Sequence, residues 1–212
     1  MFRIKRGLRP LVGLALLAIV AFASGALMGC SGEESASEGG SSAGAVSYAD
    51  SGFSSAEEAA KTYAKALSSE RSATSLEELL EARFDMLDCW HPAVLDALLL
   101  ESDCSDYEEF VIAEVYGSTT EAEALVDLYS RLYSGGVTFE LAPGEALDGD
   151  DLEDIQDELD ELGLGLEIES AYEITGSYTR TASDESESAS TVGFTGTYLV
   201  EIGGSWYIWA EF

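Results

Sequence analysis

The side chains of this sequence that could carry acid–base chemistry are few and scattered. The only histidine, His91, stands before Pro92 at a predicted break between two helices. A histidine without a fixed partner is not a catalytic constellation, so we interpret it as a turn residue beside Trp90. No Gly-x-Ser-x-Gly nucleophile motif is present either. We therefore expect no catalytic residue set.

Three tyrosines, Tyr172, Tyr178 and Tyr198, are the candidates for lining a ligand pocket. They fall in segments that alternate as strands, and their hydroxyls could donate hydrogen bonds inside a concave sheet. Strand tyrosines on an apolar face also serve as core residues that hold only the hydroxyl at the rim. Both interpretations remain open from the sequence.

Carboxylates are concentrated in residues 148–154, which read DGDDLED. This run lacks the ligand register and the terminal glutamate of a calcium-binding loop. We expect Asp148, Asp150 and Asp151 to cap the following helix instead, with weak adventitious calcium binding as the alternative. Three cysteines and one histidine make a transition-metal site a poor fit. We expect no metal and no cofactor.

Cys89 and Cys104 form the remaining pair of chemical interest. Outside the cytoplasm, two such thiols favour a disulfide, which would stabilise the fold by about 3 kcal/mol in the chain-entropy model. Spacing cannot establish geometry, so two buried, reduced cysteines are the alternative. A redox role is not expected without a Cys-x-x-Cys motif.

The N-terminal segment has the layout of an export signal. Four basic residues, Arg3, Lys5, Arg6 and Arg9, precede a small and apolar run from Leu11 to Gly29. The run ends on Leu27-Met28-Gly29-Cys30, which resembles the lipobox of bacterial lipoproteins. Met28 departs from that pattern, in which a small residue is commoner.

This resemblance implies a division of the chain into a signal peptide at 1–29, a lipidated tether at 30–52 and a single domain at 53–212. Cys30 would become the first residue of the mature protein and carry palmitate-type acyl chains. The lipid would hold the domain at the extracytoplasmic face of the cell membrane. An uncleaved anchor is the alternative, since the apolar run could just cross a bilayer of about 30 Å.

The net charge of the protein limits the classes of partner that it could bind. All 41 acidic residues follow Cys30, and the net charge is −31. Such a surface repels nucleic acid and anionic lipid headgroups, so we expect no nucleic-acid partner and only diffuse cation binding. The tether is rich in Ser, Gly, Ala and Glu and, as a flexible coil, would span about 25 to 30 Å.

The first half of the domain predicts helices. Four Ser/Thr-x-x-Glu capping boxes announce helix starts, at Ser55, Ser75, Ser105 and Thr120, and Pro92 restarts a helix after a break. Apolar residues follow each start at helical spacing. One more helix is expected at 151–162.

From Val137 the period changes to that of strands. We expect a short strand at 137–141, a turn at Pro143-Gly144, a long strand from about 166 to 178, and a hairpin loop at 183–190. A return strand and the Gly203-Gly204 turn lead to a last strand through Trp206. Helices followed by an antiparallel meander predict an α+β fold.

This layout resembles the nuclear transport factor 2-like lipoproteins of Gram-positive bacteria. The resemblance covers Ser55 to Phe212 loosely and rests on the order of elements and on the final Gly204-Ser205-Trp206-Tyr207-Ile208 strand. It implies N-terminal helices on a curved C-terminal sheet, forming a cone with a pocket at its open end. The expected helix at 151–162 departs from the simplest cone.

Two functions follow as expectations. The first is a non-enzymatic binding or accessory domain for a small ligand, a peptide or an envelope protein. The alternative is an isomerase- or hydrolase-like enzyme, which requires a carboxylate buried near a tyrosine hydroxyl. Fold alone does not decide between them.

Overall fold

The computed structural model describes residues 52–181 and 186–210. The signal peptide predicted at 1–29, the lipidation site at Cys30 and the tether up to residue 51 lie outside this part of the chain. Its order of elements is α1 (Ala56–Arg71), α2 (Leu76–Leu87), α3 (Pro92–Glu101), α4 (Tyr107–Phe110), η1 (Val111–Val115), α5 (Thr119–Leu132), β1 (Val137–Ala146), α6 (Gly149–Glu161), β2 (Ile168–Thr181), β3 (Ser186–Ile202) and β4 (Ser205–Ala210).

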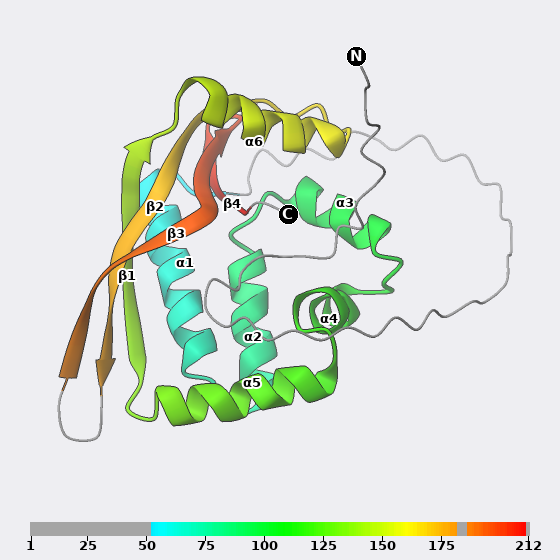
Figure 1. The fold of residues 1–212 in the computed structure, drawn as a ribbon. Helices are drawn as coiled ribbons and strands as arrows, with labels where there is room; N and C mark the ends of the chain where they lie inside the picture. The colour runs from blue at the N-terminus through cyan, green and yellow to red at the C-terminus, as the bar shows by residue number, and fades with distance from the viewer. Residues whose placement is uncertain (1–51, 182–185, 211–212) are drawn as a thin grey trace, which may run out of the picture.

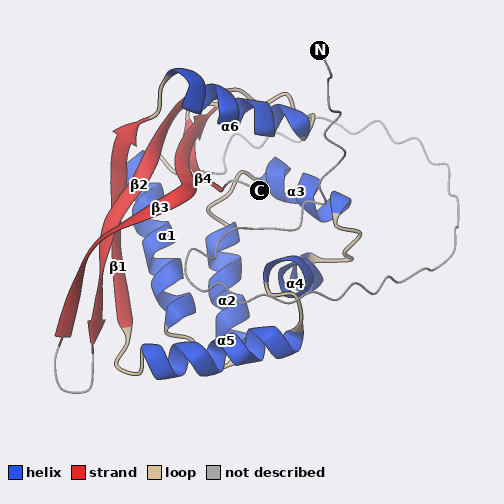
Figure 2. Ribbon diagram, in the orientation of Figure 1, coloured by secondary structure: helices blue, strands red, loops and turns tan. Residues whose placement is uncertain are grey.

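The four strands form an antiparallel meander in the order β1-β2-β3-β4. Helices α1 to α5 gather on one side of this curved sheet, and α6 lies across its upper end (Figures 1 and 2). The predicted α+β fold, with N-terminal helices packed on a curved C-terminal sheet, is confirmed. Among the described residues, no helix combines the length and apolar character needed to span a bilayer.

The space between α1 and the sheet is filled by side chains. The stripe predicted on α1 is buried, including Tyr63 and Leu67. It faces strand residues that are fully buried, among them Ile174, Leu199 and Trp209. Apolar burial of this kind supplies the main stabilisation of the fold, at about 25 cal/mol per Å².

Both edges of the sheet are covered by the chain itself. On β1, the Ser68 hydroxyl of α1 accepts a hydrogen bond from the Phe139 N–H at 2.9 Å. On β4, Phe53 pairs with Trp206, and the Cys89 carbonyl accepts from the Ile208 N–H at 2.7 Å. Because paired edges cannot template further strands, the described sheet is protected from edge-to-edge association.

Two of the predicted helix starts are shifted. Ser55 and Ser75 cap α1 and α2 as expected. Helix α4, which follows the third predicted box, is capped by Asp106 rather than Ser105, and α5 is capped by Ser118 rather than Thr120. In both cases the observed cap also has a glutamate three residues on, so overlapping Ser/Asp/Thr runs offered competing boxes.

The predicted helix after residue 105 is not a continuous α-helix. One turn, α4, passes directly into the π-helix η1. Gly117 then ends the segment with φ of +81°, a left-handed conformation suited to glycine.

Two strand predictions are corrected. Pro143 and Gly144 do not form a turn but belong to β1, where Pro143 pairs with Ile174. Proline is tolerated there because β1 is an edge strand. The loop expected at 183–190 is also too long, because residues 186–190 already belong to β3; residues 182–185 lie outside the described part. Gly203-Gly204 is a turn as predicted, both residues having positive φ.

Candidate functional site

The most unusual feature of the interior is a buried polar cluster between α1, α2 and the end of η1. Glu70 of α1 is fully buried and forms an ion pair with Arg83 of α2. The Tyr116 hydroxyl donates a hydrogen bond to Glu70 Oε1 at 3.1 Å and accepts one from Arg83 Nε at 3.3 Å. The three side chains thus tie together three segments that are separate in sequence.

Electrostatics hold this cluster in its paired form. Burial disfavours the charged guanidinium of Arg83, but Glu70 and Tyr116 outweigh this effect and raise its pKa. Burial likewise raises the pKa of Tyr116 to about 12, against the opposing influence of Arg83. The Tyr116 hydroxyl therefore remains a hydrogen-bond donor at neutral pH.

Further polar groups extend the cluster in two directions. Arg71, at the end of α1, lies over the ring of Tyr129 on α5, donates to its hydroxyl, and places Nε 3.8 Å from Glu70 Oε2. Tyr63 is buried on the same face of α1, two turns before Glu70, and burial raises the pKa of Tyr63 well above the usual range. Within the described residues, neither the Tyr63 hydroxyl nor Glu70 Oε2 has a hydrogen-bond partner.

The chemistry open to this arrangement is limited by the ion pair. Glu70 satisfies the requirement stated for an enzyme, a buried carboxylate beside a tyrosine hydroxyl. Its Oε1 atom nevertheless accepts hydrogen bonds from Arg83 and Tyr116, so only Oε2 is without a hydrogen bond among the described residues. A general base must present a lone pair to substrate, and Glu70 is closed off from solvent in this conformation.

The predicted pocket tyrosines are not brought together. Tyr172 packs on Trp206 with ring centroids 5.5 Å apart, and Tyr178 packs on Phe139 at 5.6 Å. Tyr198 pairs across the sheet with Glu173 and Trp209. All three are half-buried, in keeping with the alternative interpretation of tyrosines at the rim of the core.

Two open hollows of the described surface lie elsewhere. One, of about 450 Å³, is lined by α6 and the segment before β2, including Gln156, Asp160 and Glu167. The other, of about 630 Å³, lies between α4, η1 and the start of α5 and includes Asp106, Ile112 and Gly117. Both are open to solvent, and neither is lined by any of the three tyrosines.

The expected disulfide between Cys89 and Cys104 is not present in the structure, where both cysteines are free. Cys89 is buried after α2, and its thiol donates to the Asp85 carbonyl. Cys104 is half-buried on the far side of α3, with its thiol directed to the Ser102 carbonyl. A ten-residue helix, about 15 Å long, separates the two positions along the chain.

His91 is a helix cap rather than part of a catalytic arrangement. Its Nδ1 accepts a hydrogen bond from the Ala93 N–H at the start of α3, and its ring meets Tyr207 edge-on at 4.8 Å. Burial lowers its pKa, which favours the neutral imidazole that this cap requires.

The acidic run at 148–154 forms the start of α6. Asp148 occupies the N-cap position, although its side chain makes no capping hydrogen bond, and Asp150 and Asp151 lie in the first turn, where carboxylates favour the helix dipole. In the described part of the chain, no group of three or more His, Cys, Asp or Glu side chains is arranged to hold a metal ion.

Comparisons with protein-family models, with curated proteins and with solved structures found no match to this chain. The resemblance to nuclear transport factor 2-like lipoproteins therefore stays a resemblance of layout.

The sequence contained a signal for the buried cluster, namely the positions of Arg83 and Glu70 within apolar helix faces. Their charge favours an exposed position, which hid this signal. Arg83 falls at helical spacing within the apolar stripe of α2, between Leu79 and Leu87. Glu70 continues the buried face of α1 two turns after Tyr63. A charged residue inside an apolar stripe indicates a buried charge that must be paired, although the stripe does not say with which residue.

Proposed function

We propose that this protein is a membrane-anchored, extracytoplasmic lipoprotein whose domain is a non-enzymatic binding or accessory module of the cell envelope. The observation that carries the second half of this proposal is the state of Glu70. Among the described carboxylates, Glu70 is the one that is buried beside a tyrosine hydroxyl, as the enzyme hypothesis requires. Its charge is balanced by Arg83, and it is closed off from solvent.

The anchor is supported by the sequence. The basic residues before Leu11, the apolar run and the Leu27-Met28-Gly29-Cys30 ending together match a lipoprotein signal. A protein of net charge −31 is repelled by anionic headgroups, so stable attachment needs the lipid. Two acyl chains supply it, since each buried methylene contributes about 0.8 kcal/mol.

Action through the surface follows from the same facts. The domain presents carboxylates on most of its elements, and α6 alone carries acidic residues at most of its positions with no basic one. A partner peptide or envelope protein would therefore meet an anionic surface, and nucleic acid would be repelled.

The anchor is tested by metabolic labelling with palmitate followed by membrane fractionation of the full chain and of a Cys30→Ser variant. We expect the label and the membrane association of the processed protein to disappear in the variant. An unmodified chain that takes up no label and stays in the membrane fraction at full size would instead identify residues 11–29 as an uncleaved anchor. Cys104→Ser is the matched control and should be labelled like the unmodified chain.

The alternative function, an isomerase- or hydrolase-like enzyme, is favoured by one distance, the 3.1 Å between the Tyr116 hydroxyl and Glu70 Oε1. It requires the cluster to open to substrate. An activity found with any ester or ketone substrate and abolished by Glu70→Gln, in protein that remains folded, would replace the non-enzymatic proposal.

A further inference from the structure

We draw no further inference here: the strongest candidate, the exposed apolar surface of α3 at Leu100, close in sequence to the free and half-buried Cys104, carries no proposal because nothing among the described residues shows what covers it.

Discussion

Burial makes Glu70 and Arg83 dependent on each other. A single charge in the interior costs several kcal/mol unless it is paired and hydrogen-bonded, and these two residues satisfy each other with help from Tyr116. The pair fixes how α1 meets α2 more than it adds to stability, because apolar side chains of similar volume could fill the same space.

Arg83→Met should destabilise the domain by about 3–5 kcal/mol, since it leaves the buried Glu70 with only the more distant Arg71 as a counter-charge. Urea unfolding followed by circular dichroism measures the change. The double variant Glu70→Leu with Arg83→Met should recover part of the loss. Arg131→Met, at an exposed position of α5, is the control and should stay within about 0.5 kcal/mol of the unmodified chain. Equal effects at positions 83 and 131 would contradict the buried pair.

The two thiols of the domain should differ sharply in reactivity. Burial, with Asp88 and Asp85 nearby, raises the pKa of Cys89 to about 12, so its reactive thiolate is scarce at pH 8. Cys104 is half-buried and within reach of reagent. In a Cys30→Ser chain, a disulfide-exchange reagent should titrate Cys104 quickly and Cys89 only after denaturation. If no thiol reacts until a reductant is added, the cysteines are bridged in the exported protein.

At the residue scale, the sequence predicted roles better than partners. Local polarity and the position of Pro92 were enough to predict His91 as a turn residue, whereas the sequence left open whether the three tyrosines line a pocket or lie at the rim of the core. The pairing of Glu70 with Arg83 depends on how two helices cross, and spacing along the chain carries no information on that crossing. The unbridged cysteines illustrate the same limit.

At the scale of elements, one capping arrangement recurs. In α1 and α2, and again in α4, the glutamate at the third helical position reaches back beyond the cap to the residue before it, bonding both its N–H and its hydroxyl. The pairs are Glu58 with Ser54, Glu78 with Thr74, and Glu109 with Ser105. Each helix start is thereby closed by a charge-assisted pair of hydrogen bonds.

These bonds make the helix starts sensitive to acid. The backbone and hydroxyl hydrogen bonds from Thr74 lower the pKa of Glu78 below its ordinary value of 4.5. Folded protein therefore holds this proton less tightly than unfolded protein, so the contribution of Glu78 is fully present above about pH 4.5 and is lost as pH falls through the folded pKa. The stability difference between the unmodified chain and Glu78→Gln, from urea unfolding at several pH values, should shrink across that range. A stability difference that does not change with pH across that range would refute the assignment.

The predicted helix starts at Ser55 and Ser75 are confirmed, and those at Ser105 and Thr120 are shifted. All four regions offer more than one cap, since Ser54-x-x-Glu57 and Thr74-x-x-Glu77 are competing boxes beside the first two. A capping box in the sequence therefore locates a helix start without fixing which of two neighbouring residues is the cap. The π-turn of η1 could not be predicted, because it depends on tertiary contacts such as those of Tyr116 with Glu70 and Arg83. Pro143 misled for a related reason: its tolerance within β1 depends on an edge position that only the assembled sheet defines.

For the whole molecule, the resemblance to a cone anticipated the layout of layers but not the content of the interior. The change of period at Val137 predicts helices followed by an antiparallel sheet, and the curvature of that sheet was implied only by the resemblance. Whether the enclosed space is hollow depends on side-chain volumes at positions such as Tyr63, Leu199 and Trp209, which here fill it. The proposed binding or accessory function therefore depends on the surface of the domain, which is rich in carboxylates.

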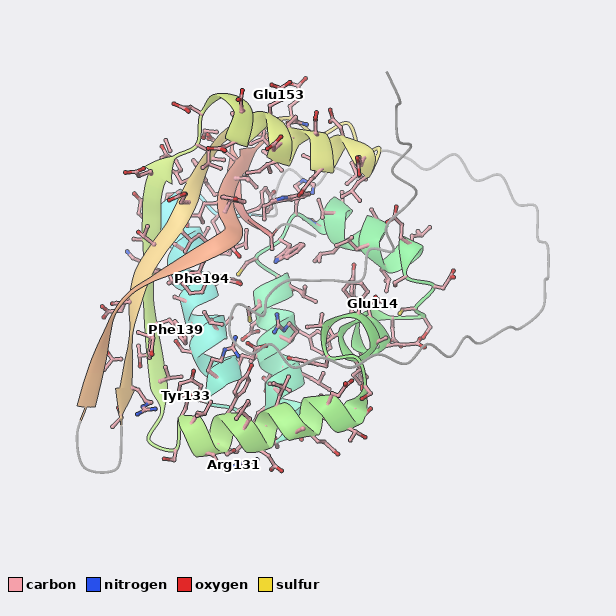
Figure 3. The ribbon with its side chains drawn as sticks, viewed as in Figure 1. Glu114, Arg131, Tyr133, Phe139, Glu153 and Phe194 are labelled. Atoms are coloured by element: carbon pink, nitrogen blue, oxygen red, sulfur yellow. The ribbon has the colours of Figure 1, made fainter. Side chains whose placement is uncertain are left out.

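Helix α6 carries part of that charge at one end of the described domain. The acidic α6, where Glu153 lies, occupies the end opposite α5 and its Arg131 (Figure 3). Carboxylates on several elements, without counter-charges of similar number, destabilise the folded state by self-repulsion at neutral pH. Screening by salt should relieve this repulsion, since the Debye length falls from about 30 Å at 0.01 M to about 8 Å at 0.15 M ionic strength.

Raising sodium chloride over that range should therefore increase the thermal midpoint of unfolding by several degrees, as measured by calorimetry on the purified Cys30→Ser chain. Calcium and magnesium at matched ionic strength separate diffuse from specific binding. Diffuse binding raises the midpoint equally with either ion, because it depends on charge alone. A specific site distinguishes them, because calcium accepts irregular carboxylate cages that magnesium does not. We expect no difference, in keeping with Asp150 and Asp151 acting on the α6 dipole. A larger calcium effect that is lost in Asp150→Asn would instead establish a calcium site at residues 148–154.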